Sequence, residues 1–148
     1  MPTNRRAKKA LLALIPPLKE GVIFELGSGF GTLAFSLAKQ FPQKTVIGYE
    51  ISPVPYFFSL ITVKLLKINN LHFIRRDFLA CSLENAALCV CYLSPKGMNQ
   101  LERKFALELT DHAFVISNTF AFPKWTPERV SQVADLYHSK IFLYRKLL

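Results

Sequence analysis

The sequence predicts an α/β fold in which helices cover both faces of a doubly wound, mostly parallel sheet of seven strands, closed by a C-terminal antiparallel hairpin. Short apolar runs alternate with segments of helical periodicity along most of the chain, the order that builds parallel strands with right-handed crossovers. The strand-like runs are continuously apolar, as expected when both faces of the sheet are buried. Only a tight turn separates the last two runs, which predicts the hairpin.

Proline and capping residues mark the ends of the predicted helices. Asn4 can cap the first helix, and Pro16 and Pro17 follow its end. Pro53 and Pro95 stand at first helical positions, where the missing N–H of proline costs nothing. Helices are therefore predicted over residues 4–15, 32–40, 53–68 and 95–109.

The strands are predicted from apolar runs between these helices. The final pair is joined by a turn at His138 and Ser139, and Cys89 and Cys91 alternate so that both face one side of their strand. The predicted strands cover residues 22–26, 45–49, 71–75, 88–93, 113–119, 130–137 and 140–146.

Composition restricts the partners of the chain. Its 148 residues suit one domain, and 19 Lys and Arg against 10 Asp and Glu give a net charge of +9. This balance favours acidic partners such as nucleic acid, anionic membrane surfaces or acidic proteins. Three cysteines without paired spacing argue against a disulfide framework and against a zinc site, so no metal is expected. We expect neither a signal peptide nor a membrane-spanning segment.

A glycine-rich loop follows the first predicted strand directly. Residues 27–31 read Gly-Ser-Gly-Phe-Gly and precede a helix, the position at which open α/β sheets bind ligands. Glycine lets the chain turn sharply and lets a ligand approach the backbone, and the helix offers free N–H groups. Thr32 stands where a dinucleotide fingerprint would have its third glycine, so the loop by itself also fits an ordinary strand-to-helix turn.

Acidic residues stand at the ends of three successive strands. Glu25 ends the first strand beside the glycine loop, where a carboxylate would face a cationic ligand. Glu50 ends the second, nineteen residues after Gly31, and can accept hydrogen bonds from both hydroxyls of a ribose. Asp77 follows the third, where it can accept from an adenine amino group while Phe78 covers the ring. The alternatives are a solvated Glu50 and an Asp77 that caps a helix.

In these motifs the chain resembles the class I methyltransferases, which have a Rossmann-like fold. Glu25-x-Gly27-x-Gly29-x-Gly31 matches their first motif, Glu50 their second, and Asp77-Phe78 their third. The resemblance implies S-adenosyl-L-methionine as cofactor, its methionine part held by Glu25 and the glycine loop, its ribose by Glu50 and its adenine side by Asp77. The cofactor-binding residues predicted in this way are Glu25, Gly27, Ser28, Gly29, Phe30, Gly31, Glu50, Ile51, Asp77, Phe78 and Leu93.

Two further segments are similar to small protein-lysine methyltransferases that act on the c ring protein of ATP synthase or on the adenine nucleotide translocase. They are residues 2–5, Pro-Thr-Asn-Arg, and residues 120–125, Phe-Ala-Phe-Pro-Lys-Trp. The resemblance implies lysine methylation of a protein, with a membrane protein among the candidates. Glu25 stands where these enzymes commonly have Asp, and no membrane anchor is expected before the domain. The single domain 1–148 then consists of an N-terminal basic helix (1–17), a cofactor-binding core (18–119) and an aromatic loop with closing hairpin (120–148).

The acceptor side is less determined. Methyl transfer needs no dedicated side-chain catalyst, so no catalytic residue is assigned. Phe120, Phe122 and Trp125 are predicted to line the substrate pocket, with core packing as the alternative. Tyr92 could be a catalytic phenol or a packed side chain. Methylation of RNA or of a phospholipid amine also suits a charge of +9, and a non-enzymatic binding module is the third option. We expect a cytoplasmic location, with peripheral attachment to a membrane as a variant of it; the oligomeric state is left open.

Overall fold

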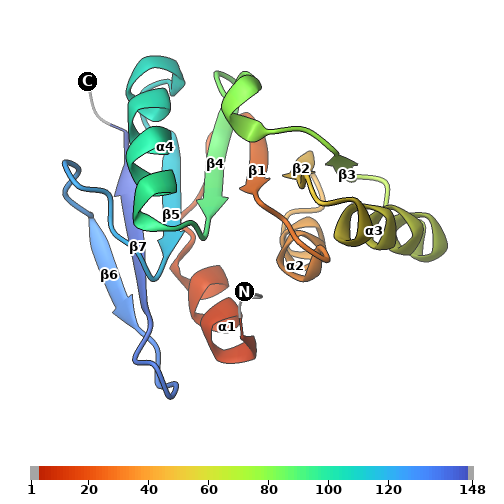
Figure 1. Ribbon diagram of the computed structural model, residues 1–148, viewed down its shortest axis with the longest axis horizontal. Helices are drawn as coiled ribbons and strands as arrows, with labels where there is room; N and C mark the ends of the chain where they lie inside the picture. Colours follow the sequence, from red (N-terminus) through yellow and green to blue (C-terminus); the bar gives the residue numbers. More distant parts are fainter. Residues whose placement is uncertain (1–3, 147–148) are drawn as a thin grey trace.

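The computed structural model describes residues 4–146 as one twisted seven-stranded sheet with helices on both faces (Figure 1). The spatial strand order is β3-β2-β1-β4-β5-β7-β6. The strands are β1 (Val22–Leu26), β2 (Val46–Tyr49), β3 (Leu71–Ile74), β4 (Ala86–Cys91), β5 (Phe114–Asn118), β6 (Arg129–Gln132) and β7 (Lys140–Arg145). All neighbours are parallel except that β7 runs antiparallel to both β5 and β6, so the predicted fold class is confirmed.

Two apolar layers hold the helices against the sheet. Three helices pack on one face, α1 (Arg5–Leu14), α2 (Thr32–Gln40) and α3 (Pro53–Leu66). The other face is covered by α4 (Pro95–Glu108) and the short 3₁₀ helix η1 (Phe78–Ala80). Successive strand residues alternate between the layers, as Ile23 and Phe24 do, because side chains along a strand point to opposite faces.

The helix ends agree with the local signals. The Asn4 side chain accepts a hydrogen bond from the backbone N–H of Ala7 at 2.8 Å, and α1 ends before the two prolines. Lys67 adopts a left-handed conformation at the end of α3 and stops that helix earlier than the periodicity indicates. Pro2 and Thr3, half of the N-terminal segment used in the sequence comparison, lie outside the described residues.

The predicted strand over residues 130–137 is wrong in its extent. The strand β6 ends at Gln132, and a loop occupies residues 133–139 instead of a two-residue turn. The Asp135 carboxylate organises this loop, accepting from the backbone N–H groups of Tyr137 at 3.2 Å and Ser139 at 2.9 Å. An Asp side chain that bonds the backbone just after it favours a turn over a strand. The fourth strand is likewise shifted, to Ala86–Cys91, so Tyr92 and Leu93 follow it.

Candidate functional site

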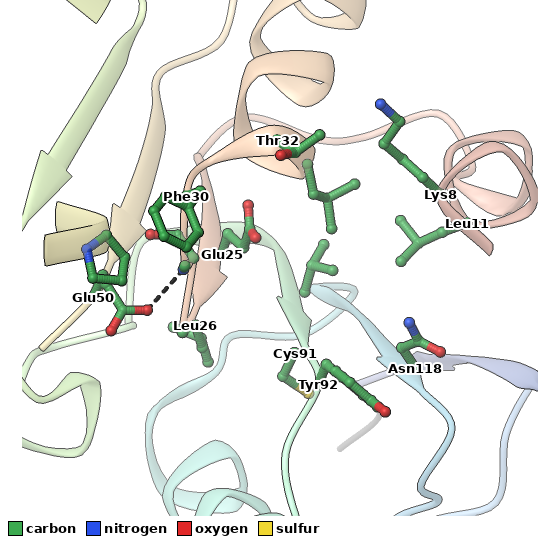
Figure 2. Close-up of a pocket in the computed structure, with 16 residues that line it drawn as sticks. Lys8, Leu11, Glu25, Leu26, Phe30, Thr32, Glu50, Cys91, Tyr92 and Asn118 are labelled. Carbon is green, nitrogen blue, oxygen red and sulfur yellow. Dashed lines mark hydrogen bonds between the residues drawn. The ribbon is translucent and has the colours of Figure 1, made fainter. Parts of the chain in front are cut away.

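A cavity of about 300 Å³ opens at the carboxyl ends of the parallel strands, between β1 and β4 (Figure 2). The chain connects β1 to strands on one side of it and β4 to strands on the other. In open α/β sheets this reversal leaves a crevice in which ligands bind. The cavity extends from the glycine loop to the N-terminal parts of α1, α2 and α3.

The glycine loop has the backbone that its sequence predicted. Gly27, Gly29 and Gly31 have φ angles of 83°, 57° and 84°, in the region that side chains disfavour. A Cβ atom added to Gly27 or Gly29 would meet no protein atom within 4 Å, whereas one at Gly31 would lie 2.6 Å from the ring of Phe73. The first two glycines thus leave open space beside the cavity, and the third allows close packing.

Glu25 lies in the cavity wall with one carboxylate oxygen unpaired. It is buried, and its Oε2 atom has no hydrogen-bond partner within the described chain; the Ser28 hydroxyl is in the same state. Burial, and then repulsion from Glu50, raise the pKa of Glu25 well above its usual value, although a bond to the Ala34 backbone opposes the shift. An unpaired buried carboxylate beside open space is a ready partner for a cation, because such a group is costly to leave unpaired.

Glu50 is fixed at the rim of the same space. Its Oε1 atom accepts from the Gly29 N–H at 2.7 Å, and its Oε2 atom accepts from the Ser52 N–H at 2.9 Å. Figure 2 shows the first of these bonds, which ties the end of β2 to the glycine loop. Because a carboxylate oxygen has a second acceptor site, both oxygens retain capacity for ligand hydroxyls.

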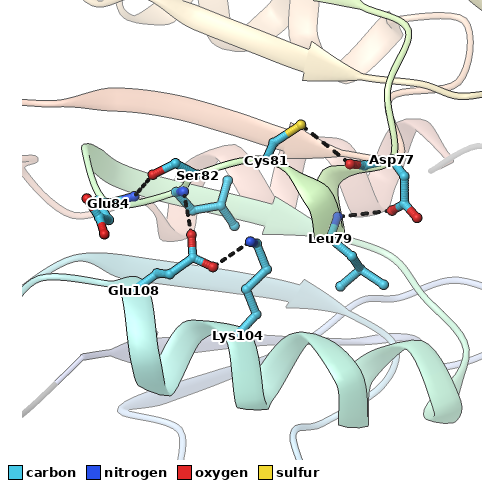
Figure 3. Close-up of polar contacts among 8 residues, drawn as sticks. Asp77, Leu79, Cys81, Ser82, Glu84, Lys104 and Glu108 are labelled. Carbon is cyan, nitrogen blue, oxygen red and sulfur yellow. Dashed lines mark hydrogen bonds and ion pairs between the residues drawn. The ribbon is translucent and has the colours of Figure 1, made fainter.

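A second cavity of about 220 Å³ adjoins the first, and Gly27 and Glu50 line both. Ile51, Asp77 and Phe78 line it, as the sequence predicted for one ligand site. The Asp77 carboxylate also accepts from the Leu79 N–H at 3.0 Å and so caps η1 (Figure 3). Both interpretations of Asp77, cap and ligand contact, are therefore compatible with its position.

A separate polar contact supports this side of the sheet. Figure 3 shows Lys104 and Glu108 of α4 paired with each other, and Glu108 accepts from the Leu83 N–H at 3.0 Å. This contact joins α4 to the loop that leads from η1 to β4, and it lies away from both cavity linings.

The aromatic residues predicted for the substrate pocket separate into two groups. Phe122 is buried against Tyr144, with ring centroids 4.9 Å apart, and Trp125 packs on Phe105 of α4. Neither lines a cavity, so the structure gives Phe122 and Trp125 the core-packing role that was the alternative. Phe120 stacks on Tyr92 at 6.5 Å, and Tyr92 lines the main cavity.

Leu93 also lies off the cavity. Its side chain packs against the start of α4, 3.2 Å from where a Cβ atom of Gly97 would be, and it belongs to the core on that face. The predicted strand 88–93 placed Leu93 at the sheet edge, but β4 ends two residues earlier, so the chain has already turned toward α4.

Three lining residues were not singled out as cofactor or substrate contacts from the sequence. Lys8 and Leu11 of α1 reach the cavity, and Asn118 ends β5 within it. Asn118 has the same signal as Glu50, a polar residue at the end of a parallel strand, and could have been found by it. Lys8 gives no local signal, since only the docking of α1 on the sheet brings it there.

Metal ligands and membrane-spanning helices are both absent from the described part of the chain. No group of three or more His, Cys, Asp and Glu side chains within residues 4–146 is placed to hold a metal ion. In the same residues, no helix is long and apolar enough to cross a bilayer.

Comparison with known proteins identifies the family. Residues 25–129, which include the glycine loop, Glu50 and Asp77, match the family described as ANTKMT methyltransferase domain. The chain belongs to this family. The family resemblance inferred from the sequence motifs is thereby confirmed.

Individual relatives of this methyltransferase domain are named for lysine modification. The lysine N-methyltransferase of Mus musculus that is named for the C protein of ATP synthase is 31% identical over 115 residues, 76% of this chain and 45% of that protein. The chain spans about half the length of the vertebrate relatives it matches. A protein-lysine N-methyltransferase of Saccharolobus islandicus is 22% identical over 97% of this chain and 91% of its own length.

Solved structures support the fold of the methyltransferase domain. An RNA methyltransferase from Salinibacter ruber, in complex with S-adenosyl-L-homocysteine, superposes with a TM-score of 0.87 at 22% identity, covering 98% of this chain and 93% of that one. TrmN from Thermus thermophilus superposes with a TM-score of 0.76 at 16% identity, covering 95% of this chain and 48% of that one.

Proposed function

We propose that this chain binds S-adenosylmethionine along the carboxyl edge of its sheet and transfers the methyl group to a lysine side chain of a protein. The observation that carries the proposal is the buried Glu25 carboxylate, with Oε2 unpaired, beside a glycine loop whose missing side chains leave open space. A ligand that is cationic at one end and bears a nucleoside at the other fits this arrangement. Membership of a methyltransferase family supports it.

The two adjoining cavities suit the two halves of such a cofactor. The larger one offers Glu25 and the N-terminus of α2 to the charged methionine part. The Glu50 carboxylate stands where the cavities meet and is already oriented by Gly29 and Ser52, so it can accept ribose hydroxyls without reorganisation. Ile51 and Phe78 provide apolar contact for an adenine ring in the smaller cavity.

When bound, the cofactor supplies a methyl group on a positively charged sulfur, and a neutral amine displaces it directly as the carbon–sulfur bond breaks. The chain must hold the amine in line and favour its neutral form. Neutralising a lysine of pKa about 10.4 near pH 7 costs roughly 4–5 kcal/mol. The stacked pair Tyr92 and Phe120 offers an apolar wall at the acceptor side of the cavity, and desolvation there lowers the pKa of an amine.

A lysine acceptor is supported by the names of several relatives, including the adenine nucleotide translocase lysine N-methyltransferase of Mus musculus, 28% identical over 115 residues. Incubation of the chain with methyl-labelled cofactor and cell fractions, followed by amino-acid analysis, tests this. We expect label in methylated lysine. Label confined to RNA or to lipid would contradict the lysine acceptor while leaving the cofactor site in place.

The cofactor site has its own test. Glu50→Ala should weaken S-adenosylhomocysteine binding in calorimetry by at least tenfold, since it removes two acceptor oxygens from the junction of the cavities. Glu84→Ala, at an exposed carboxylate outside both cavity linings, is the matched control. Equal affinity of the two variants would show that the site has been misplaced.

A further inference from the structure

The outward side of α3 is apolar and exposed. Val54, Phe57, Phe58, Ile61 and Leu65, defined here as the α3 apolar face, are between 52% and 77% exposed. Their spacing of i, i+3, i+4, i+7 and i+11 places them on one stripe of the helix. A surface helix normally turns such a stripe to the core, so the exposure of five large apolar side chains together marks an interaction site.

The opposite side of α3 already packs on the protein. Tyr56 and Val63 lie against the core of the sheet face that carries α1 and α2, and Ser59 is fully buried between α3 and the glycine loop. The helix is therefore apolar on both sides, and the α3 apolar face is not needed to hold it in place. Its exposure requires another explanation than marginal packing.

The α3 apolar face continues to the mouth of the candidate active site. The ring of Phe58 contacts that of Phe30 edge to face at 5.3 Å, and Phe30 is half exposed and lines the main cavity. Pro55, in the first turn of α3, lines the cavity as well. A surface that covered the α3 apolar face would therefore lie beside the entrance to the cavity.

Charge around the face selects its partner. α3 contains no acidic residue and carries Lys64 beside the stripe, with Lys67 directly after it. Arg75 donates to the Ile51 carbonyl at 3.0 Å, which holds its guanidinium near the N-terminal end of α3. A second copy of a chain with net charge +9 would be repelled by this surface, whereas anionic lipid headgroups would be attracted.

We propose that the α3 apolar face docks on an anionic phospholipid bilayer, with its side chains at the level of the acyl-chain boundary and its basic neighbours at the headgroups. Helices with a large apolar stripe and flanking lysines bind membranes in this orientation. The entrance of the cavity would then face the membrane surface. That the acceptor lysine lies close to the bilayer rests on the proposed methyl transfer, whereas the docking itself does not.

Vesicle flotation with the whole chain tests the docking. Vesicles of phosphatidylcholine with about one-third phosphatidylglycerol should bind the chain more tightly than phosphatidylcholine alone, and added salt should weaken the binding. The double variant Ile61→Gln/Leu65→Gln keeps charge and helix propensity and should bind at least tenfold more weakly. Its matched control, Leu107→Gln/Leu136→Gln, removes two side chains that are 88% and 94% exposed on other surfaces and should bind as the wild type does.

Several results would overturn the docking. They are failure of the wild type to bind the anionic vesicles, equal binding by the α3 double variant, and self-association of the wild type that the same variant abolishes without any vesicle binding. S-adenosylhomocysteine affinity, measured on every variant, verifies the fold and separates the two proposals. Vesicle binding without any cofactor binding would refute the proposed function and leave the docking intact.

Discussion

Replacing Glu25 by Gln tests the reasoning on the candidate site most directly. The change keeps the shape of the side chain and removes its charge. In the wild type the carboxyl is buried, its Oε2 atom is unpaired, and burial raises its pKa well above the usual value near 4.5. The free protein therefore has a destabilising group at neutral pH that a bound cation would satisfy. We expect opposite effects of Glu25→Gln on stability and on cofactor affinity.

The effect on stability has a defined sign. Because the folded pKa of Glu25 is raised, the folded state keeps its proton at pH values where the unfolded chain has lost it. The free energy of unfolding then falls by about 1.4 kcal/mol for each pH unit between the ordinary and the raised pKa. Glu25→Gln should remove this decline, so the variant should gain stability relative to the wild type as the pH rises above 4.5.

The effect on affinity follows from the lost attraction. Opposite charges about 4 Å apart attract by about 4 kcal/mol at an effective dielectric constant of about 20. Part of this offsets the cost of ionising a carboxyl whose pKa is raised, which leaves about 2–3 kcal/mol, or about 30- to 150-fold in the dissociation constant. Wild-type affinity should also increase with pH through the raised pKa of Glu25, with release of a proton on binding.

Urea unfolding from pH 5 to 8 and calorimetry with S-adenosylmethionine measure both quantities. Glu84→Gln, at an exposed carboxylate away from the cavities, is the control for loss of one negative charge. If the stability curves of wild type and Glu25→Gln run parallel with pH and their affinities differ by less than threefold, Glu25 is not the partner of the cationic group.

Further expectations concern packing and titration. Gly31→Ala should cost about 2–4 kcal/mol in urea unfolding, because its Cβ would lie 2.6 Å from the Phe73 ring at a φ of 84°, whereas Gly27→Ala should cost only about 1–2 kcal/mol; equal costs would contradict the packing argument. Trp125→Ala should lower stability by about 2–3 kcal/mol and leave the KM for the acceptor unchanged in a methyl-transfer assay, since its ring lies in the core; a raised KM would return it to the substrate pocket. Hydrogen bonds from Ser139 and Asn4 lower the pKa of Asp135 to about 2, so its stabilising effect should be lost as pH falls from 3.8 toward 2, and Asp135→Asn should remove that part of the acid transition in thermal melts.

Local sequence was sufficient for the fold and for one side of the site. The alternation of apolar runs with helical segments predicted a seven-stranded sheet with one antiparallel strand, and the structure has it. Glu25, Glu50 and Asp77 were placed at strand ends by their position in the chain alone, and all three line the two cavities. This succeeded because parallel strands bring their carboxyl ends to a common edge, so a residue just after a strand has a known location.

Tertiary structure decided what faces that edge. Phe122 and Trp125 have the composition of a pocket wall, yet they pack against α4 and Tyr144, residues that are distant in the sequence. Lys8 belongs to a helix whose basic side looked solvated, and docking of α1 brings it to the cavity. The exposure of the α3 apolar face could not be predicted either, because a helix that is apolar on all sides does not specify which side the sheet will cover. The sequence by itself thus determined the sheet, the glycine loop and the acidic residues beside it, since these depend on neighbours along the chain; the acceptor side and the exposed surface depend on contacts between distant segments, which only the folded chain defines.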